Sequence, residues 1–313
     1  MQPPWLLASK TDMHKYLYSF LLTISFAQVS DYAYTGAEAS AMAGAIVAEK
    51  GNNWSIFHNP AGLTEINGTQ FSAGGGRLYG FNWLPIYHLN SIIPIPEIGQ
   101  MGFALQQLET KYSGKTLSKE QTLSIAQGFD LQHDKNSRLA IGYTANFVQW
   151  DLGKSAGVSG DGSDGLELGS VNAVTVDFGV LASLREKYRF GVFLKNINSG
   201  ALGKGITRQV LPRRINAGIT YMPMTGLATS IVSEHLLGRD DMQIKSAVKY
   251  TLNPHIKIYT GAQSNPNRFG LGFTIKLDRV ADAGLGDNYT LSYGLLTHPI
   301  LPLTHQFNLG ISL

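Results

Sequence analysis

The sequence contains no cysteine, which excludes disulfides, thiol catalysis and cysteine-ligated metals. Charged residues make up only 15%, well below the quarter that is typical of soluble domains. Lysine and arginine are scattered rather than gathered into a basic stripe, so nucleic acid is not an expected partner. The chain has no run of 18 apolar residues, so we expect no membrane-spanning helix.

Catalytic and metal-binding patterns are also missing. The eight histidines show no metal spacing, and His133, Asp134 and Ser137 share one predicted turn rather than forming a catalytic constellation. The loop 160–165 (GDGSDG) has carboxylates spaced like a calcium loop but lacks the closing glutamate. We therefore predict a protein that is not an enzyme, with no cofactor and no bound metal.

The first 27 residues read as a secretory signal. Lys15 supplies the positive end, residues 16–24 (YLYSFLLTI) form an apolar core, and small residues precede a cleavage position after Ala27. Met1 and Met13 are both possible starts. The alternative, a buried N-terminal helix, fits less well because the next segment is polar.

From about residue 69 onward, apolar and polar residues alternate with a period of two. In the last segment Phe307, Leu309 and Ile311 alternate with Asn308 and Gly310. This pattern predicts fourteen strands, at 69–77, 83–94, 98–110, 119–132, 137–151, 170–185, 187–197, 211–222, 225–236, 240–252, 255–264, 267–276, 287–296 and 304–313.

The two faces of these strands differ in a way that favours a transmembrane β-barrel. One face is rich in glycine, threonine, serine and asparagine, which suit a curved and hydrated lumen. The other face is apolar, and Tyr221, Tyr250 and Trp150 near strand ends suit a membrane interface. A soluble sandwich or lipocalin-like barrel would need more charge outside. We predict an all-β barrel at 69–313, set in outer-membrane lipid of a Gram-negative-type bacterium.

The connections between strands predict two different rims. The turns at 223–226 and 253–254 are short and fall on one rim, whereas 151–170 and 198–211 are longer and are expected to be extracellular. The long connection at 277–287 falls on the short-turn rim. Either that rim has one long connection, or the strand count is wrong by one before it.

Five charged residues fall on the polar face and should point into the lumen. Charges inside a barrel must pair or meet water. They are expected either to form ion pairs that fill the lumen, the favoured interpretation, or to line a path for a ligand. These residues are Asp177, Arg214, Glu234, Lys245 and Lys249.

An irregular stretch precedes the strands. A small-residue run at 36–48 (GAEASAMAGAIVA) is followed by Trp54, Phe57 and the motif Asn59-Pro60-Ala61-Gly62-Leu63. This arrangement resembles the N-terminal signature of the FadL-like outer-membrane proteins. The resemblance implies a 14-stranded barrel with residues 28–68 folded into the lumen as a plug or hatch. Asn59 and Pro60 should fix a turn, and Gly62 should allow a sharp bend.

Within that superfamily the chain is most similar to the shorter PorV/PorQ-type branch, through 190–197, 214–221 and 304–310. The terminal Leu313 departs from the usual phenylalanine. This similarity implies protein contacts in type IX secretion or in surface attachment of exported proteins, with secretion-system proteins or cargo as partners. The alternative is a passive FadL-like transporter whose ligand is a hydrophobic small molecule such as a long-chain fatty acid.

Overall fold

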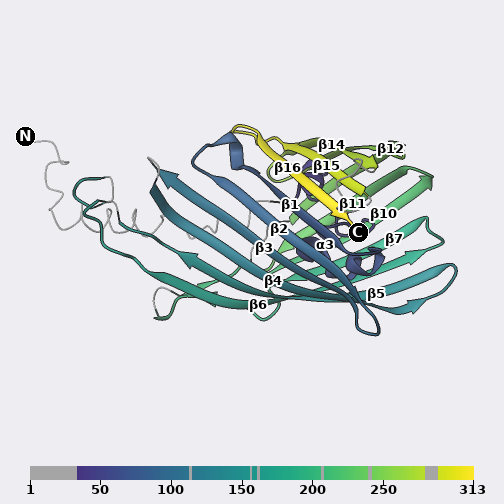
Figure 1. The fold of residues 1–313 in the computed structure, drawn as a ribbon, viewed down its shortest axis with the longest axis horizontal. Coiled ribbons are helices and arrows are strands. Elements are labelled where there is room, and N and C mark those ends of the chain that lie inside the picture. Colours follow the sequence, from purple (N-terminus) through teal and green to yellow (C-terminus); the bar gives the residue numbers. More distant parts are fainter. Residues whose placement is uncertain are drawn as a thin grey trace, which may run out of the picture. The chain divides into compact units, whose positions relative to one another are not determined.

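A computed structural model describes residues 34–112, 115–155, 157–160, 163–205, 208–238, 242–278 and 288–313. Within these ranges, antiparallel strands close into a single barrel (Figure 1). The predicted signal peptide, 1–27, and residues 28–33 of the predicted plug lie outside the described residues. No helix in the described ranges is long and apolar enough to cross a membrane.

The barrel has fourteen strands, and neighbours in sequence are neighbours in space. β1 pairs with both β2 and β16, which closes the sheet, and β7 pairs directly with β10. The intervening β8 (Ala201–Leu202) and β9 (Gln209–Val210) pair only with each other. The barrel strands are β1 Gln70–Arg77, β2 Pro85–Ile95, β3 Gly99–Tyr112, β4 Lys115–His133, β5 Ser137–Asp151, β6 Ser170–Leu184, β7 Tyr188–Lys195, β10 Arg214–Met224, β11 Leu227–Leu236, β12 Met242–Asn253, β13 Ile256–Gln263, β14 Arg268–Asp278, β15 Asn288–Leu296 and β16 Thr304–Ser312.

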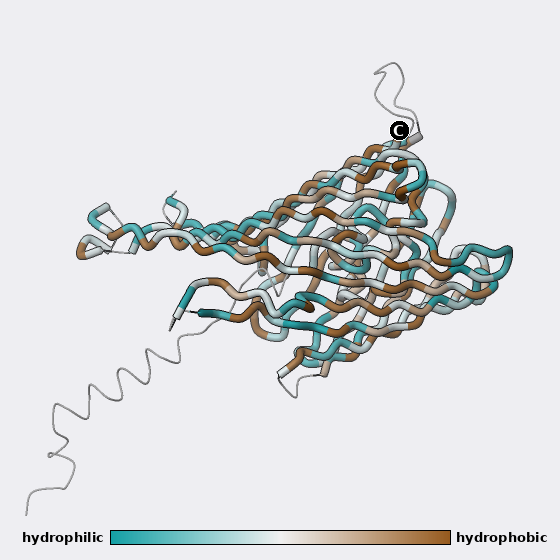
Figure 2. The backbone as a smooth tube through the Cα atoms, turned by 90° about the horizontal axis from the view of Figure 1, so that it is seen from below, coloured by the Kyte–Doolittle hydropathy of each residue, from teal (hydrophilic) through white to brown (hydrophobic). Residues whose placement is uncertain are grey.

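Each of the fourteen predicted strands corresponds to one barrel strand, so the predicted fold class is confirmed. The sequence pattern succeeds because every strand has one apolar and one polar face, and this alternation is visible along the tubes in Figure 2. The count also settles the rims. β14 ends and β15 begins on the rim of the short turns, and residues 279–287 between them are outside the described ranges.

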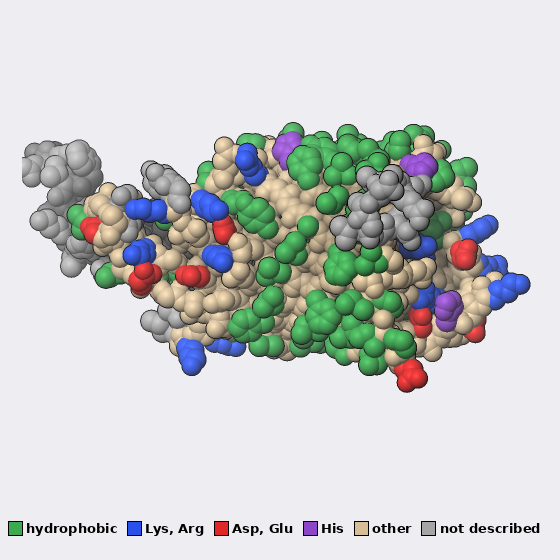
Figure 3. Space-filling view, in the orientation of Figure 1, with side chains coloured by type: hydrophobic (Ala, Val, Ile, Leu, Met, Phe, Trp, Pro, Cys, Tyr) green, Lys and Arg blue, Asp and Glu red, His purple; other side chains and the backbone are tan. Residues whose placement is uncertain are grey.

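The outer face of the barrel is apolar. Phe307 and Leu309 on β16 are 56% and 48% exposed, and Figure 3 shows hydrophobic side chains over the middle of the barrel with charges toward its two ends. Because all strands pair with two neighbours and the apolar face points outward, the barrel is built to span a lipid bilayer. This architecture confirms the predicted location in the outer membrane of a Gram-negative-type bacterium.

The aromatic residues predicted at the membrane interface do not all lie outside. Tyr221 and Tyr250 are more than two-fifths exposed on the outer face, as predicted. The prediction for Trp150 is wrong. Its position on β5 has the inward parity of Val148, and its Nε1 donates to Ser118 Oγ at 2.7 Å. The residue is even-numbered on a strand whose odd-numbered side chains face lipid.

Residues 34–67, here called the N-terminal segment, cross the inside of the barrel. The segment contains α2 (Ala37–Ala41), α3 (Ser55–His58) and the 3-10 helix η3 (Pro60–Glu65). A further short 3-10 helix, η4 (Leu78–Gly80), follows β1. α2 lies against β13–β16, whereas η3 lies against β3–β6 on the other side. The segment therefore contacts opposite walls.

Candidate functional site

The motif at 59–63 forms a capped 3-10 turn. Asn59 is extended (φ −170°), its Oδ1 accepts from Ala61 N at 3.2 Å, and Pro60 occupies the first turn. The Asn59 amide donates to Val47 O at 2.8 Å and to Val180 O of β6 at 3.0 Å. Asn59 thus shapes the turn and also ties it to the barrel wall.

Gly62 acts differently from the expectation. It lies inside η3 without a left-handed backbone, so it does not bend the chain sharply. A Cβ at Gly62 would lie 3.0 Å from Ser55 Oγ and 3.2 Å from Gly51 Cα. Its value is therefore close packing between two parts of the N-terminal segment.

The other predicted motif residues are also buried. Trp54 is 3% exposed, Ala61 and Leu63 are fully buried, and Phe57 packs at the edge of an apolar cluster. The cluster joins the segment to the wall through Ile56, Leu63, Ile66, Ile92, Ala104 and Ala126. These contacts hold η3 against β2, β3 and β4 by apolar burial.

The inward glycines of the wall make room for the N-terminal segment. A Cβ at Gly142 would lie 2.4 Å from the Pro60 carbonyl carbon, and one at Gly294 would lie 2.0 Å from Ala37 O. The sequence pattern attributed such residues to barrel curvature and lumen hydration. The structure adds a second reason, close approach of the segment's backbone, which also applies to Gly128, Gly191, Gly261 and Gly270. At Gly102 and Gly179, side chains of the segment occupy the space that a Cβ would take.

Trp54 is held by a polar group on β16. With its amide nitrogen turned toward His88, Asn308 accepts from Trp54 Nε1 at 2.8 Å and from Ala37 N at 2.7 Å. The Trp54 ring meets the His88 ring edge-on, with centroids 4.6 Å apart. Asn308 therefore binds the N-terminal segment at two points, Ala37 and Trp54.

Ion pairs link several of the predicted lumen charges to one another and to the N-terminal segment. Glu234 accepts from Arg214 and from Lys245, each at 2.7 Å, and Lys245 is 1% exposed. Lys249 pairs with Glu49 of the N-terminal segment. These pairs lie inside the barrel, and the interpretation that they serve to fill the lumen stays a prediction.

Asp177 accepts hydrogen bonds from an amide side chain and from the backbone. Its Oδ2 accepts from Asn146 Nδ2 at 2.7 Å, and its Oδ1 accepts from the backbone N of Asn196 at 2.7 Å. The first bond crosses the inner face of the wall, and the second fixes the start of the loop after β7. This carboxylate therefore shapes the half of the lumen toward the long-loop rim.

Sequence reasoning missed the partners on the N-terminal segment. Glu49 accepts from Ser230 at 2.6 Å besides Lys249, and Glu65 pairs with Arg189 of β7 at 2.6 Å. Burial opposes the charge on Glu49, yet Lys249 lowers its pKa below the ordinary value. Alternation along β7 places Arg189 inside, which was a usable signal. The glutamates lie outside any periodic pattern.

His58 is a partly buried histidine of the N-terminal segment. Its Nε2 lies 2.7 Å from Thr35 O, and burial lowers its pKa to about 4. The ring is therefore neutral at pH 7, and its Nε2–H donates a hydrogen bond to that carbonyl. His58 joins the end of α3 to the beginning of the segment.

A second apolar cluster fills the barrel toward the rim of long loops. The loop between β7 and β10 places Leu202 and Leu211 on the inner face of β5 and β6, against Val148 and Ala173. Along β5, residues 140–144 contact the N-terminal segment and Val148 contacts this loop. Two different segments therefore occupy the two halves of the lumen.

The described part of the wall is continuous. Each barrel strand is hydrogen-bonded to both neighbours, and register shifts occur only as local irregularities, such as those near Thr110 and Asp130. In the same ranges no three histidine or acidic side chains gather where a metal could bind. The site is thus a set of packing and ion-pair contacts within a closed wall.

Comparisons with known proteins support the fold. No family model matches the sequence, and no curated protein matches it. Among solved structures, the CymD monoaromatic hydrocarbon channel superposes with a TM-score of 0.60 at 12% identity, over 90% of this chain and 99% of that one.

Two further structures are toluene transporters. TbuX of Ralstonia pickettii has a TM-score of 0.57 at 12% identity, covering 91% of this chain and 100% of that one. TodX of Pseudomonas putida has a TM-score of 0.52 at 13% identity, covering 88% and 96%. The predicted similarity to FadL-like barrels is thus confirmed for the fold, and the PorV/PorQ branch stays a prediction.

Proposed function

We propose that this protein is a passive channel for small hydrophobic molecules in the outer membrane, with the N-terminal segment as its plug. The observation that carries the proposal is the barrel shared along almost the full length of hydrocarbon and toluene channels. The proposal involves no catalysis. It adopts the transport alternative in place of the secretion role favoured by the sequence.

The two ends of the lumen support different steps of transport. The cluster of Leu202, Leu211, Val148 and Ala173 offers an apolar surface near the long-loop rim, where a hydrophobic molecule would first bind. Below it, the N-terminal segment fills the barrel. Passage therefore requires the segment to shift, which makes the described arrangement the closed one.

Uptake measurements test this proposal directly. Vesicles with the refolded barrel should take up radiolabelled toluene faster than protein-free vesicles corrected for simple partition. Leu202→Arg should slow uptake because it places a charge in the apolar cluster. Leu309→Ala, on the lipid face, is the matched control and should not. Equal uptake with and without the barrel would contradict a transport role.

A second candidate is the secretion-associated role through protein contacts. The continuous wall and the ion pairs inside the lumen favour this role. A barrel that acts by binding partners on its outside needs no open path through its wall or its lumen. Native extraction in mild detergent followed by mass spectrometry separates the two candidates. Bound hydrophobic molecules support the channel, and stoichiometric secretion components support the second role.

A further inference from the structure

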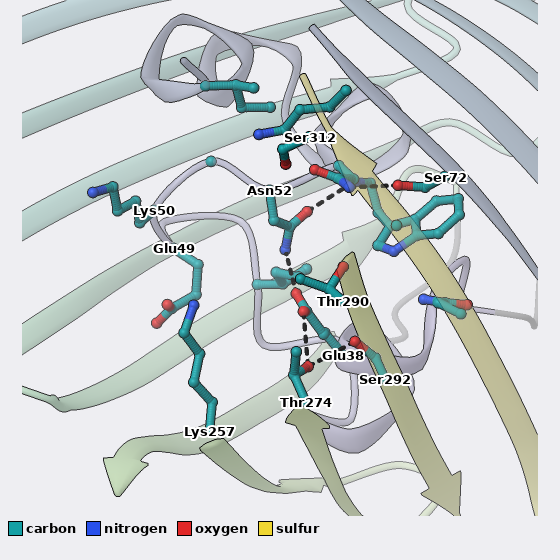
Figure 4. A pocket seen from close by; sticks show the side chains of 18 of the residues that line it. Glu38, Glu49, Lys50, Asn52, Ser72, Lys257, Thr274, Thr290, Ser292 and Ser312 are labelled. Carbon is teal, nitrogen blue, oxygen red and sulfur yellow. Dashed lines mark hydrogen bonds between the residues drawn. The ribbon is translucent and has the colours of Figure 1, made fainter. Parts of the chain in front are cut away.

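A polar cavity lies at the short-turn rim, between the N-terminal segment and the ends of the surrounding strands. Its volume is about 340 Å³, which lies within the range of small-molecule sites. Hydroxyl and amide groups dominate the wall shown in Figure 4, including Asn52, Thr274, Thr290, Ser292 and Ser312. Such a wall favours a polar ligand over a hydrocarbon.

One carboxylate on the cavity wall lacks a cationic partner. Glu38 of α2 accepts from Asn52 Nδ2 and Thr274 Oγ1, both at 3.1 Å, and from Tyr259 OH at 3.3 Å. In the described part of the chain no lysine or arginine forms an ion pair with it. Three neutral donors hold the carboxylate in place and leave its charge uncompensated.

Two ammonium groups on the other side of the cavity also lack a partner of opposite charge within the described ranges. Lys50 and Lys257 are exposed and line the cavity, and neither forms an ion pair within the described ranges. Glu49, which lies between them in Figure 4, is already paired with Lys249. The cavity therefore carries one negative wall and one positive wall.

We propose that this cavity binds a small zwitterion, a molecule with an ammonium group and a carboxylate. The ammonium group would bind Glu38, and the carboxylate would bind Lys257 and Lys50. Charge-assisted hydrogen bonds are the strong ones, and the two walls supply both signs. The inference does not rest on transport, since the cavity lies beyond the plug from the apolar cluster.

Binding would also hold the N-terminal segment in place. Glu38 and Lys50 belong to the segment, whereas Lys257 belongs to β13, so one ligand would bridge the two. A ligand that binds only the assembled form stabilises that form by mass action. The ligand would thus stabilise the described position of the N-terminal segment inside the barrel.

Three probes of equal chain length separate the possible outcomes. 4-Aminobutyrate carries both charges, butylamine only the positive one, and butyrate only the negative one. Calorimetric titration of the full barrel in detergent should show 4-aminobutyrate binding about tenfold tighter than either single-charge probe. Equal binding of all three, or binding of none, would overturn the proposal.

Two variants assign the charges. Glu38→Gln should weaken 4-aminobutyrate about tenfold and leave butyrate unchanged, and Lys257→Gln should weaken it similarly and leave butylamine unchanged. Lys187→Gln, on an exposed turn of the same rim, is the control. Heat-modified electrophoretic mobility reports folding. If Glu38→Gln fails to fold, Lys257→Gln decides, and unchanged 4-aminobutyrate binding in it rejects the site.

Discussion

Glu49 illustrates what a charge inside this barrel requires. The side chain is 5% exposed and depends on Lys249 and Ser230 for compensation. Desolvation of a carboxylate costs several kcal/mol unless a cation lies beside it. The intact pair therefore adds little net stability, whereas the loss of one partner would leave a buried and uncompensated charge.

Removal of Lys249 should destabilise the barrel strongly. Lys249→Met leaves Glu49 buried without a cation, and we expect a loss of about 3–5 kcal/mol of unfolding free energy. The double variant with Glu49→Gln should recover much of it. Urea unfolding of vesicle-inserted protein measures both, with Lys187→Met as the exposed control. Similar stability of Lys249→Met and the native protein would show that the pair is not needed.

His58 should make stability depend on pH. Its folded pKa of about 4 lies below the ordinary 6.5, so the unfolded chain binds the proton more readily. The contribution is therefore complete above pH 6.5 and is lost as pH falls toward 4. The full loss amounts to about 3 kcal/mol. Unfolding midpoints at pH 7, 5.5 and 4 measure this.

The matched variant is His58→Gln, which keeps a donor near Thr35 O but does not titrate. Its stability should change less between pH 7 and pH 4 than that of the native protein. Parallel pH profiles in the two proteins would mean that other groups cause the acid sensitivity.

At the scale of elements, strands were predictable and the N-terminal segment was not. A strand with one face in lipid must alternate, so β14 and β16 are readable from their own residues. The turn at 59–63 was recognised only through a motif. Its contacts depend on wall residues such as Gly142 and Val180 that are distant in sequence. No local pattern encodes such pairings, and the ion pairs of Glu49 and Glu65 were missed for the same reason.

The turn should control how tightly the lumen is closed. Pro60→Ala with Gly62→Ala removes the fixed φ of the first turn and crowds Ser55 and Gly51. We expect a looser segment and faster swelling of proteoliposomes in small sugars. Unchanged swelling and unchanged heat stability would show that the turn does not restrict the lumen.

The contact between the same turn and the barrel wall can be tested by a substitution on β5. A Cβ at Gly142 would collide with the Pro60 backbone, so Gly142→Ala should cost about 1–3 kcal/mol of stability through overpacking. Ala145→Val adds methyl groups on the lipid face of the same strand and is the control. Equal stability of the two variants would contradict tight contact between β5 and η3.

At the scale of the whole molecule, the two proposed sites lie at opposite rims of the barrel, so the orientation of the barrel in the membrane decides which side each site faces. Both ends of the barrel sequence, Gln70 and Ser312, lie on the short-turn rim with the polar cavity. Short turns are typical of the periplasmic side of bacterial barrels, and longer loops of the outside. The apolar cluster would then face the exterior, and the zwitterion cavity the periplasm.

The absence of cysteine makes this orientation measurable, because a single introduced thiol is the only one that reacts. Val158, fully exposed in the loop after β5, should as Val158→Cys react with a membrane-impermeant maleimide on intact cells. Glu186→Cys, on an exposed turn of the opposite rim, should react only after the outer membrane is permeabilised. The reverse labelling would place the polar cavity outside. Hydrophobic molecules would then meet the N-terminal segment first, and the proposed route through the apolar cluster would fail.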